Sequence, residues 1–391
     1  MATLPTFDVD LYSDAVLDDP YDLYRELRNA GPVVHLSRYG FYALPRYDDV
    51  RAALGDWQRF SSAKGVAMND QMNDILAGTV IATDPPEHMR LRKILERPIA
   101  PKEVAALRGR IVELAEALAA RLSEMDAFDA ASDLAHYLPL TVVSELIGLP
   151  EEGRQRILAW AAASFDIMAA AGAPRMEEAG HIMGEMMEYV MDPSLPERLR
   201  PDGWAARLFN AVEKGEIAPG QPEVMIQGYL NPSLDTTIFA TTNLIWLFAR
   251  YPDQWQELRE NPALVPRAIN EAIRLESPIQ HFSRVTTEDV QIDGSLIPAH
   301  SRILVMYGSA NRDERHYQMA EKFDVRRENS DHLGFGYANH MCVGMNLAKL
   351  EITALVQALL PRISRFELVD AKRARNNLLR GFESLKVRVH R

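Results

Sequence analysis

The stretch that decides how the chain is interpreted reads HLGFGYANHMCVG, from His332 to Gly344. It contains Cys342, the only cysteine among 391 residues, which excludes an intramolecular disulfide and a multi-cysteine zinc site. The stretch is glycine-rich and runs into an apolar segment, Met345 to about Leu360, which we predict to be a helix. Cys342 therefore lies at a helix entrance, where free backbone N–H groups and the helix dipole favour a thiolate.

A lone cysteine in this position has two interpretations. Most single cysteines are small buried hydrophobic residues, and Cys342 taken alone fits that description. A thiolate at a helix entrance also suits a single axial ligand to a metal that is held mainly by a porphyrin. Both interpretations stay open on the cysteine alone.

The pattern around the cysteine, Phe-Gly-x-x-x-His-x-Cys-x-Gly, resembles the heme-binding loop of the cytochrome P-450 heme-thiolate monooxygenases. The resemblance implies heme b as cofactor, Cys342 as the iron ligand, and His340 against a heme propionate. Phe335 and Gly344 complete the cofactor-binding loop. The family usually has a second glycine where this chain has Ala338, and a side chain there is costly if the loop needs a positive φ.

Length alone suggests two domains, but large single domains reach this size, and the resemblance covers nearly the whole chain. It therefore implies one heme-thiolate monooxygenase domain over residues 1–391. The net charge of -12 argues against nucleic acid or an anionic membrane as the main partner. We see no apolar N-terminal run, so we expect neither a signal peptide nor a membrane anchor. One cysteine fits the reducing cytoplasm, where we expect the protein to act.

Apolar periodicity predicts a mainly α fold with small peripheral β-sheets, and the cytochrome P-450 fold is of that kind. We predict helices over 20–28, 47–54, 87–122 with short breaks, 141–148, 151–168 and around Met183 to Met191. Strands are predicted over 33–36 and 41–44 as a hairpin, and over 290–297, 302–307 and 385–389. The Pro-rich, charged region 193–222 is predicted to connect helices over the surface.

The longest apolar run, Pro222 to about Arg250, is predicted to be one long helix with a kink. Its middle reads LNPSLDTT, and a mid-helix proline, here Pro232, removes one backbone hydrogen bond and clashes with the carbonyl four residues back. The helix should therefore open just before an acid and two hydroxyls. Such groups either hold water and relay protons or are simply capped within a kinked core helix.

The same segment resembles the family's oxygen-activating pattern, Ala/Gly-Gly-x-Asp-Thr-Thr. Asp235 and Thr236 then match the acid–alcohol pair that delivers protons, and we predict them to be catalytic. Pro232 and Ser233 replace the usual small pair, and Ser233 adds bulk and a hydroxyl near the oxygen site.

Glu271 and Arg274 lie three residues apart, on one face of a predicted helix. Such a pair is common on helix surfaces, but here it matches the family's Glu-x-x-Arg motif. Arg327 matches the third member of that buried triad. We interpret the three as residues that hold the fold rather than as catalytic groups.

A heme carries two propionates, so the protein must offer cations or hydrogen-bond donors at fixed places. His88 and Arg92 lie at i and i+4 of a predicted helix and resemble the family's His-x-x-x-Arg anchor. Arg284 matches another anchor of the family.

These motifs occur in family order, and they imply a monooxygenase that activates O2 with electrons from a separate ferredoxin and an NAD(P)H-dependent ferredoxin reductase. The chain itself carries no flavin or iron–sulfur segment. A non-catalytic heme-thiolate sensor or carrier is an alternative from another class, and the pair Asp235 and Thr236 argues against it. The same pair argues against a peroxide-driven peroxygenase.

For the substrate, segments 61–66, 277–282 and 376–384 look similar to bacterial enzymes that demethylate methoxybenzoates. We therefore predict O-demethylation, or else hydroxylation, of a small methoxylated aromatic, either a benzoate or a guaiacol- or syringol-type phenol, in aromatic catabolism. Those enzymes usually have arginine at the position of Lys64 and an Arg-Ser pair at that of Gln227-Gly228. Hydroxylation of a terpene or another secondary metabolite remains the alternative. The predicted substrate-binding residues are Lys64, Val66, Phe165, Gln227, Ser233, Phe282 and Phe382.

Overall fold

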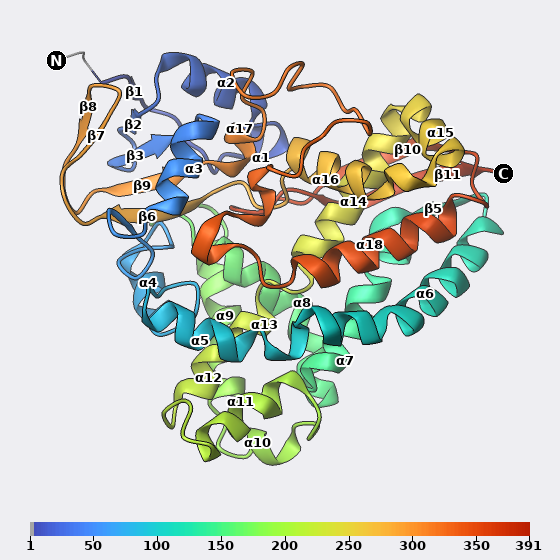
Figure 1. Ribbon diagram of the computed structural model, residues 1–391, viewed down its shortest axis with the longest axis horizontal. Helices are drawn as coiled ribbons and strands as arrows, with labels where there is room; N and C mark the ends of the chain where they lie inside the picture. The colour runs from blue at the N-terminus through green and yellow to red at the C-terminus, as the bar shows by residue number, and fades with distance from the viewer. Residues whose placement is uncertain (1–3) are drawn as a thin grey trace.

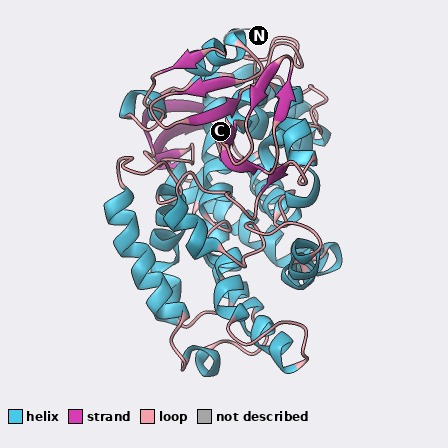
Figure 2. Ribbon diagram, turned by 90° about the vertical axis from the view of Figure 1, so that its left-hand side faces the viewer, coloured by secondary structure: helices cyan, strands magenta, loops and turns pink. Residues whose placement is uncertain are grey.

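Helices make up most of the computed structural model, which describes residues 4–391, and three small sheets lie at its periphery (Figure 1). Figure 2 shows the strands gathered toward one end of the molecule, with helices filling the rest. The prediction of a mainly α fold with small peripheral sheets is confirmed.

The α-helices are α1 (Asp14–Asp18), α2 (Tyr21–Ala30), α3 (Tyr47–Gly55), α4 (Asp70–Leu76), α5 (Glu87–Leu95), α6 (Pro101–Ser123), α7 (Ser144–Ile147), α8 (Glu151–Asp166), α9 (Met176–Val190), α10 (Leu195–Arg198), α11 (Trp204–Glu213), α12 (Gln221–Met225), α13 (Gln227–Leu230), α14 (Asp235–Arg250), α15 (Pro252–Glu260), α16 (Val265–Leu275), α17 (Tyr307–Ala310) and α18 (Met345–Leu359). Short 3-10 or π turns are η1 (Arg97–Ile99), η2 (Ala130–Ala135), η3 (Pro139–Val143), η4 (Pro262–Leu264), η5 (Leu333–Phe335) and η6 (Ala338–His340). The strands are β1 (Thr6–Phe7), β2 (Val34–Leu36), β3 (Phe41–Leu44), β4 (Phe60–Ser61), β5 (Ala127–Asp129), β6 (Phe282–Thr286), β7 (Val290–Ile292), β8 (Ser295–Ile297), β9 (Arg302–Val305), β10 (Arg365–Arg373) and β11 (Phe382–His390).

The largest sheet has the strand order β1-β2-β3-β9-β6-β4. The predicted hairpin forms its β2–β3 pair, and the turn at Asp293 and Gly294 joins β7 to β8 in a separate two-stranded sheet. Sequence patterns missed β6, which is buried along its whole length and so shows no polar alternation. They also missed β10. Only Phe366 on that strand is fully buried, so the strand lacks the regular alternation of apolar and polar residues that sequence patterns detect.

One prediction about the helical part was wrong. The region 193–222 is not simply a surface connection, because it contains α11. Trp204, Leu208 and Ala211 follow the helical spacing and bury one face of α11. The prolines and charges that flank α11 obscured this short amphipathic pattern.

The predicted long helix is interrupted rather than kinked. Helix α13 ends at Leu230, and α14 begins at Asp235, so the chain leaves the helix over residues 231–234. Pro232 lies in this gap, as its missing N–H and its clash with the preceding turn require. The opening was therefore predicted at the right place but underestimated in extent.

Two helices frame the interior where the site lies. Helix α18 packs against α6 and α16, and α14 packs against α16 and against η2. Their buried side chains belong to one continuous hydrophobic cluster that extends through the described residues. This packing fixes the start of α14 and the start of α18 relative to each other.

Candidate functional site

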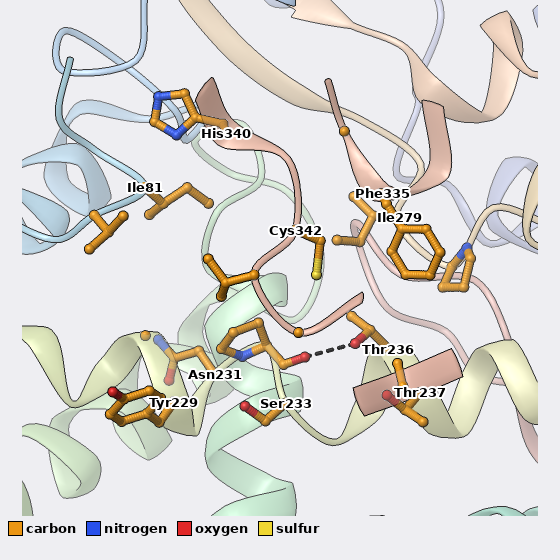
Figure 3. A pocket seen from close by; sticks show the side chains of 18 of the residues that line it. Ile81, Tyr229, Asn231, Ser233, Thr236, Thr237, Ile279, Phe335, His340 and Cys342 are labelled. Carbon is orange, nitrogen blue, oxygen red and sulfur yellow. Dashed lines mark hydrogen bonds between the residues drawn. The ribbon is translucent and has the colours of Figure 1, made fainter. Parts of the chain in front are cut away.

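A cavity lies between the loop that carries Cys342 and the non-helical segment that precedes α14 (Figure 3). Its space free of protein atoms, with the open solvent at its mouth included, is about 1890 Å³. Figure 3 shows the Cys342 sulfur on one side and Ser233, Thr236 and Thr237 on the other. The two segments that the sequence singled out therefore face one cavity.

The geometry of the cysteine loop follows from its glycines. A side chain on Gly334 would meet the Ile273 side chain of α16 at 2.5 Å, so the loop can approach that helix only with glycine there. Gly336 has a φ of 73°, in the left-handed region that glycine adopts freely. The Cys342 N–H then donates to the Phe335 carbonyl over 2.8 Å, which directs the thiol into the cavity.

Ala338, where the family usually has glycine, has a φ of 55°. The loop therefore does need a positive φ at this position. An alanine in the left-handed region costs roughly 1–2 kcal/mol relative to the right-handed one. The strain is local and leaves Cys342 in place.

The electrostatics at Cys342 correct one expectation. Cys342 is exposed to the cavity, but the protein atoms packed around its sulfur desolvate the thiol and raise its pKa, although the N–H groups of Gly344 and Met345 and the nearby cations Arg92 and Lys349 act to lower it. The helix entrance thus favours the thiolate, as predicted, but this desolvation outweighs it in the protein alone. A bound metal ion would reverse the balance, because a coordinating thiol is deprotonated outright.

Four basic side chains gather beside the loop. The rings of His88 and His340 lie 4.3 Å apart between centroids, and Arg92 donates to the Asn339 carbonyl over 3.0 Å. Arg284, on β6, is 4% exposed and donates to the adjacent Ser283 carbonyl. The pKa of His340 is lowered to about 2, mainly by burial and also by the nearby Arg284, His88 and Arg92.

This cluster has more hydrogen-bond donors than the protein uses. His88 is 1% exposed, yet neither of its ring nitrogens has a partner in residues 4–391, and His340 Nε2 has none either. Buried groups of this kind are nearly always satisfied, and a buried cation needs a counter-charge. Two carboxylates entering this side of the cavity would satisfy both needs. The cluster and the cysteine therefore fit a heme, with its iron at Cys342 and its propionates at the basic cluster.

On the other side of the cavity, Thr236 and Asp235 point in different directions. The Thr236 hydroxyl lines the cavity and donates to the Pro232 carbonyl over 2.7 Å (Figure 3). Because its proton is used in this bond, the hydroxyl oxygen can only accept a hydrogen bond from the cavity side. It is therefore suited to hold a water molecule.

Asp235 is 7% exposed and does not line the cavity. Its Oδ2 has no partner among the described residues. The pKa of Asp235 is raised to about 7, mainly by burial and also by the charge of Asp166 at the end of α8. The carboxyl can thus hold or release a proton near neutral pH, one residue away from Thr236.

The predicted substrate residues divide into two groups. Five of them line the cavity, namely Val66, Phe165, Gln227, Ser233 and Phe282. The other two predictions were wrong. Lys64 is exposed and lies outside the cavity, on a turn. In this turn the Lys64 N–H donates to the Ser61 hydroxyl, and the Gly65 N–H donates to the Ser62 carbonyl. Phe382 packs against Trp246 and the Arg373 guanidinium instead.

The Glu271 carboxylate, which is fully buried, receives several hydrogen bonds. Arg274 donates to its two oxygens over 2.8 and 2.9 Å, and Arg327 donates to one of them over 2.9 Å. Asn329 and the backbone N–H of Asp324 complete the set. These contacts tie α16 to the segment that precedes the cysteine loop, and none of these residues lines the cavity.

Sequence reasoning missed some cavity residues. Asn231 lies one helical turn after Gln227, and that spacing was the available signal. Trp204 lines the cavity from α11, the helix that was not predicted. Tyr229 also lines it, and its hydroxyl donates to the Leu95 carbonyl over 2.7 Å.

Comparisons with known proteins agree with the site. The family model described as Cytochrome P450 matches residues 229–382. Cytochrome p450 CYP199A2 of Rhodopseudomonas palustris is 34% identical over 99% of this chain and 95% of that protein. Linalool 8-monooxygenase of Pseudomonas putida is 29% identical over 97% of both chains. The structure of cytochrome P450 CYP109Q5 from Chondromyces apiculatus superposes with a TM-score of 0.81 at 28% identity, over 98% of both chains.

The site and the comparisons together define a heme-thiolate oxygenase. The chain belongs to the cytochrome P450 family. It is a monooxygenase of the bacterial type, whose members bind heme b and use O2, redox partners and small substrates. Within residues 4–391, no helix is both long enough and apolar enough to cross a membrane.

Proposed function

We propose that this monooxygenase removes the methyl group from a small methoxylated aromatic compound. It acts in the reducing cytoplasm and takes electrons from a separate ferredoxin, which an NAD(P)H-dependent reductase reduces. A single cysteine cannot hold a cysteine-ligated iron–sulfur cluster, which supports a separate donor. The observation that carries the proposal is the cavity wall, where Phe165, Phe282 and Val66 offer aromatic and apolar side chains to an aromatic ring.

The chemistry balances with O2 as oxidant. One oxygen atom is inserted into a C–H bond of the methoxy group, and the other leaves as water with two electrons and two protons from outside. The resulting hemiacetal breaks its C–O bond unaided, giving the phenol and formaldehyde. The methyl carbon must be held in place, because a misplacement of about 1 Å can cost ~100-fold in rate.

The residues of the chain have distinct roles in this proposal. Bound heme supplies the oxidising chemistry, with Cys342 as its thiolate ligand. The propionates are held by the basic cluster of His88, Arg92, Arg284 and His340. Thr236 holds a water molecule, and Asp235 supplies its proton. Phe335 and Gly344 line the cavity beside the ligand.

Ligation by Cys342 is tested by spectroscopy. The reduced, carbon monoxide-bound protein should show the red-shifted Soret band of thiolate ligation. Cys342→Ser should lose this band while the protein remains folded. A heme-loaded serine variant that keeps the band would overturn the assignment.

The function itself is tested by formaldehyde release. Purified protein with a generic ferredoxin, its reductase and NADH is supplied with methoxyphenols and methoxybenzoates, and formaldehyde is measured against NADH consumed. We expect formaldehyde only when all components are present, and unchanged yields in Lys64→Ala, since Lys64 lies outside the cavity. No formaldehyde from either class of compound would discard the demethylase and leave the monooxygenase.

A second candidate is hydroxylation of a terpene or another secondary metabolite. One relative is named for linalool, and the largely apolar wall of this cavity would also accept such a molecule. A non-catalytic sensor is the candidate from another class. It would bind ligands without consuming NADH, and the same assay separates it.

A further inference from the structure

Two side-chain amides on the α13 side of the cavity have unused hydrogen-bonding groups. Gln227 is 2% exposed and lines the cavity, yet neither Oε1 nor Nε2 has a partner among residues 4–391. Asn231 also lines the cavity, and its Oδ1 has no partner there either. Buried amides in native proteins are rarely left unpaired. Two such groups in one wall therefore point to a ligand that satisfies them.

The two amides are placed to act together. The Asn231 N–H donates to the Gln227 carbonyl over 3.0 Å, which sets the residues one helical turn apart. Figure 3 shows Asn231 and Ser233 on the α13–α14 side, across from the loop that carries Cys342. A polar group bound here leaves the rest of a small molecule free to extend toward Cys342.

Two neighbouring hydroxyls are already used in hydrogen bonds within the protein. The Tyr229 hydroxyl already donates to the Leu95 carbonyl over 2.7 Å, and the Ser164 hydroxyl donates to the Ala161 carbonyl over 2.7 Å. The cations that line the cavity are Arg92 and Arg284, and both belong to the basic cluster around His340. Within the described part of the chain, the α13 wall thus presents uncharged hydrogen-bonding groups and no cation.

We propose that Gln227 and Asn231 form the subsite that recognises an uncharged group able both to donate and to accept a hydrogen bond, such as a hydroxyl or a primary amide. An amide side chain offers an oxygen that accepts and an NH2 that donates. A carboxylate has no proton for Gln227 Oε1 or Asn231 Oδ1, and it would lose its water without gaining a cation. The subsite therefore selects neutral substrates, and this inference rests on the proposed function for the methoxylated ring.

Three probes test the subsite, because they share the ring and the methoxy group and differ only opposite it. They are para-methoxybenzamide, para-methoxybenzoate and para-methoxytoluene. Their dissociation constants are measured with the heme-loaded protein, from the change in its absorption spectrum. We expect wild type to bind the benzamide ~10-fold more tightly than the toluene, as two neutral hydrogen bonds imply. The benzoate should bind more weakly than the benzamide.

The variants separate this role from packing. Gln227→Leu should abolish the preference for the benzamide over the toluene while keeping the affinity for the toluene. Gln227→Arg should raise the affinity for the benzoate ~10-fold, because a guanidinium pairs with a carboxylate. Ser164→Ala is the matched control, since it removes a cavity hydroxyl that is already paired, and it should change none of the three affinities.

The outcomes of the subsite and of the demethylase are distinguishable. Equal wild-type affinity for the benzamide and the toluene, or tightest binding of the benzoate, overturns the subsite even if a variant does not fold. Formaldehyde release is scored separately on the same probes. Its absence with the benzamide preference intact supports the subsite and overturns only the demethylase. Formaldehyde release without any preference for the benzamide over the toluene overturns the subsite alone.

Discussion

The buried polar groups around Glu271 and those around α13 lie in the same protein but in opposite states. The Glu271 carboxylate receives hydrogen bonds from Arg274, Arg327, Asn329 and a backbone N–H. By contrast, Gln227 and Asp235 carry buried atoms without any partner among residues 4–391. Both regions are deeply buried, so exposure does not distinguish them. The difference is that both carboxylate oxygens of Glu271 accept hydrogen bonds, although Oδ1 of the neighbouring Asn329 has no partner among residues 4–391, whereas the Gln227 side chain has no partner there at all.

The difference suggests how to separate structural from functional polar residues here. A satisfied network rigidifies the region around it, and its removal is strongly destabilising. An unsatisfied buried group lowers stability in the protein alone, and it persists where a ligand or a proton uses it. We therefore expect substitutions at the first region to change stability and substitutions at the second to change binding, proton transfer or pH dependence.

The largest effect is expected for Glu271→Gln. The substitution leaves the buried guanidinium of Arg274 without its counter-charge, and breaking such a pair costs about 3–5 kcal/mol. The free energy of unfolding, measured with denaturant on heme-loaded protein, should fall by that amount. Glu87→Gln is the control, because Glu87 and Arg90 form an exposed pair worth about 0–1 kcal/mol. Equal losses in the two variants would contradict the structural role of the triad.

Asp235 should make stability depend on pH. Its pKa is raised from the ordinary value of 3.8 to about 7 in the folded protein, mainly by burial. Between these values the folded protein binds the proton that the unfolded chain has released, so stability falls as the pH rises through this window. The slope is at most about 1.4 kcal/mol per pH unit.

Asp235→Asn should remove this contribution to the slope, while Asp49, Asp166 and Glu351, whose pKa values burial also raises, keep theirs. The variant should match wild type near pH 4 and be more stable than wild type above pH 7, as measured by denaturant unfolding across the range. Thr236→Ala lies next in the chain and should retain the wild-type slope. An unchanged slope in Asp235→Asn would mean that the carboxyl is ionised and solvated in the folded protein.

The sequence predicted the region around Cys342 better than the region around α13, and the reason is physical. The cysteine loop is specified locally by Gly334, Gly336 and the apolar helix that follows, so a short pattern is sufficient. The contacts of Glu271 were also expected, from spacing and resemblance. The break at Pro232 depends on how far tertiary packing lets the helix open, and sequence periodicity does not contain that information.

The same reasoning accounts for the residues that were misplaced. Lys64 was assigned to the cavity from its position in a segment that does reach it at Val66, but the turn between them directs the lysine outward. Phe382 was assigned by residue type, and packing against Trp246 occupies it instead. Trp204 was overlooked because its helix is short and lies among prolines and charges.

A smaller effect is expected for Thr236→Ala, which tests whether the second region handles protons. Removing the hydroxyl removes the acceptor for a cavity water, and a proton-transfer step of this kind contributes at least ~100-fold. Substrate affinity should stay unchanged, while product per NADH falls and hydrogen peroxide appears. Thr236→Ser keeps the hydroxyl and should remain coupled. Full coupling at an unchanged rate in Thr236→Ala would move the proton relay elsewhere, with Ser233 as the next candidate.

The smallest effect is expected at Ala338, where the backbone of the cysteine loop is strained. Its φ of 55° costs roughly 1–2 kcal/mol for a residue with a Cβ, and glycine would avoid this cost. Glycine also gives the unfolded chain more conformational entropy, which offsets about 0.4–1 kcal/mol of the gain in stability. Ala338→Gly should therefore raise the free energy of unfolding by about 0.5–1 kcal/mol. Met319→Gly is the matched control, because Met319 also has a positive φ, 47°, and lies outside the cavity. A similar gain in both variants, with heme spectra unchanged, would show that the positive φ costs Ala338 as much as it costs Met319, and that the contacts of the loop do not offset this strain. If Ala338→Gly gives no gain while Met319→Gly does, then those contacts prefer the methyl group, and the departure from the family pattern is itself stabilising.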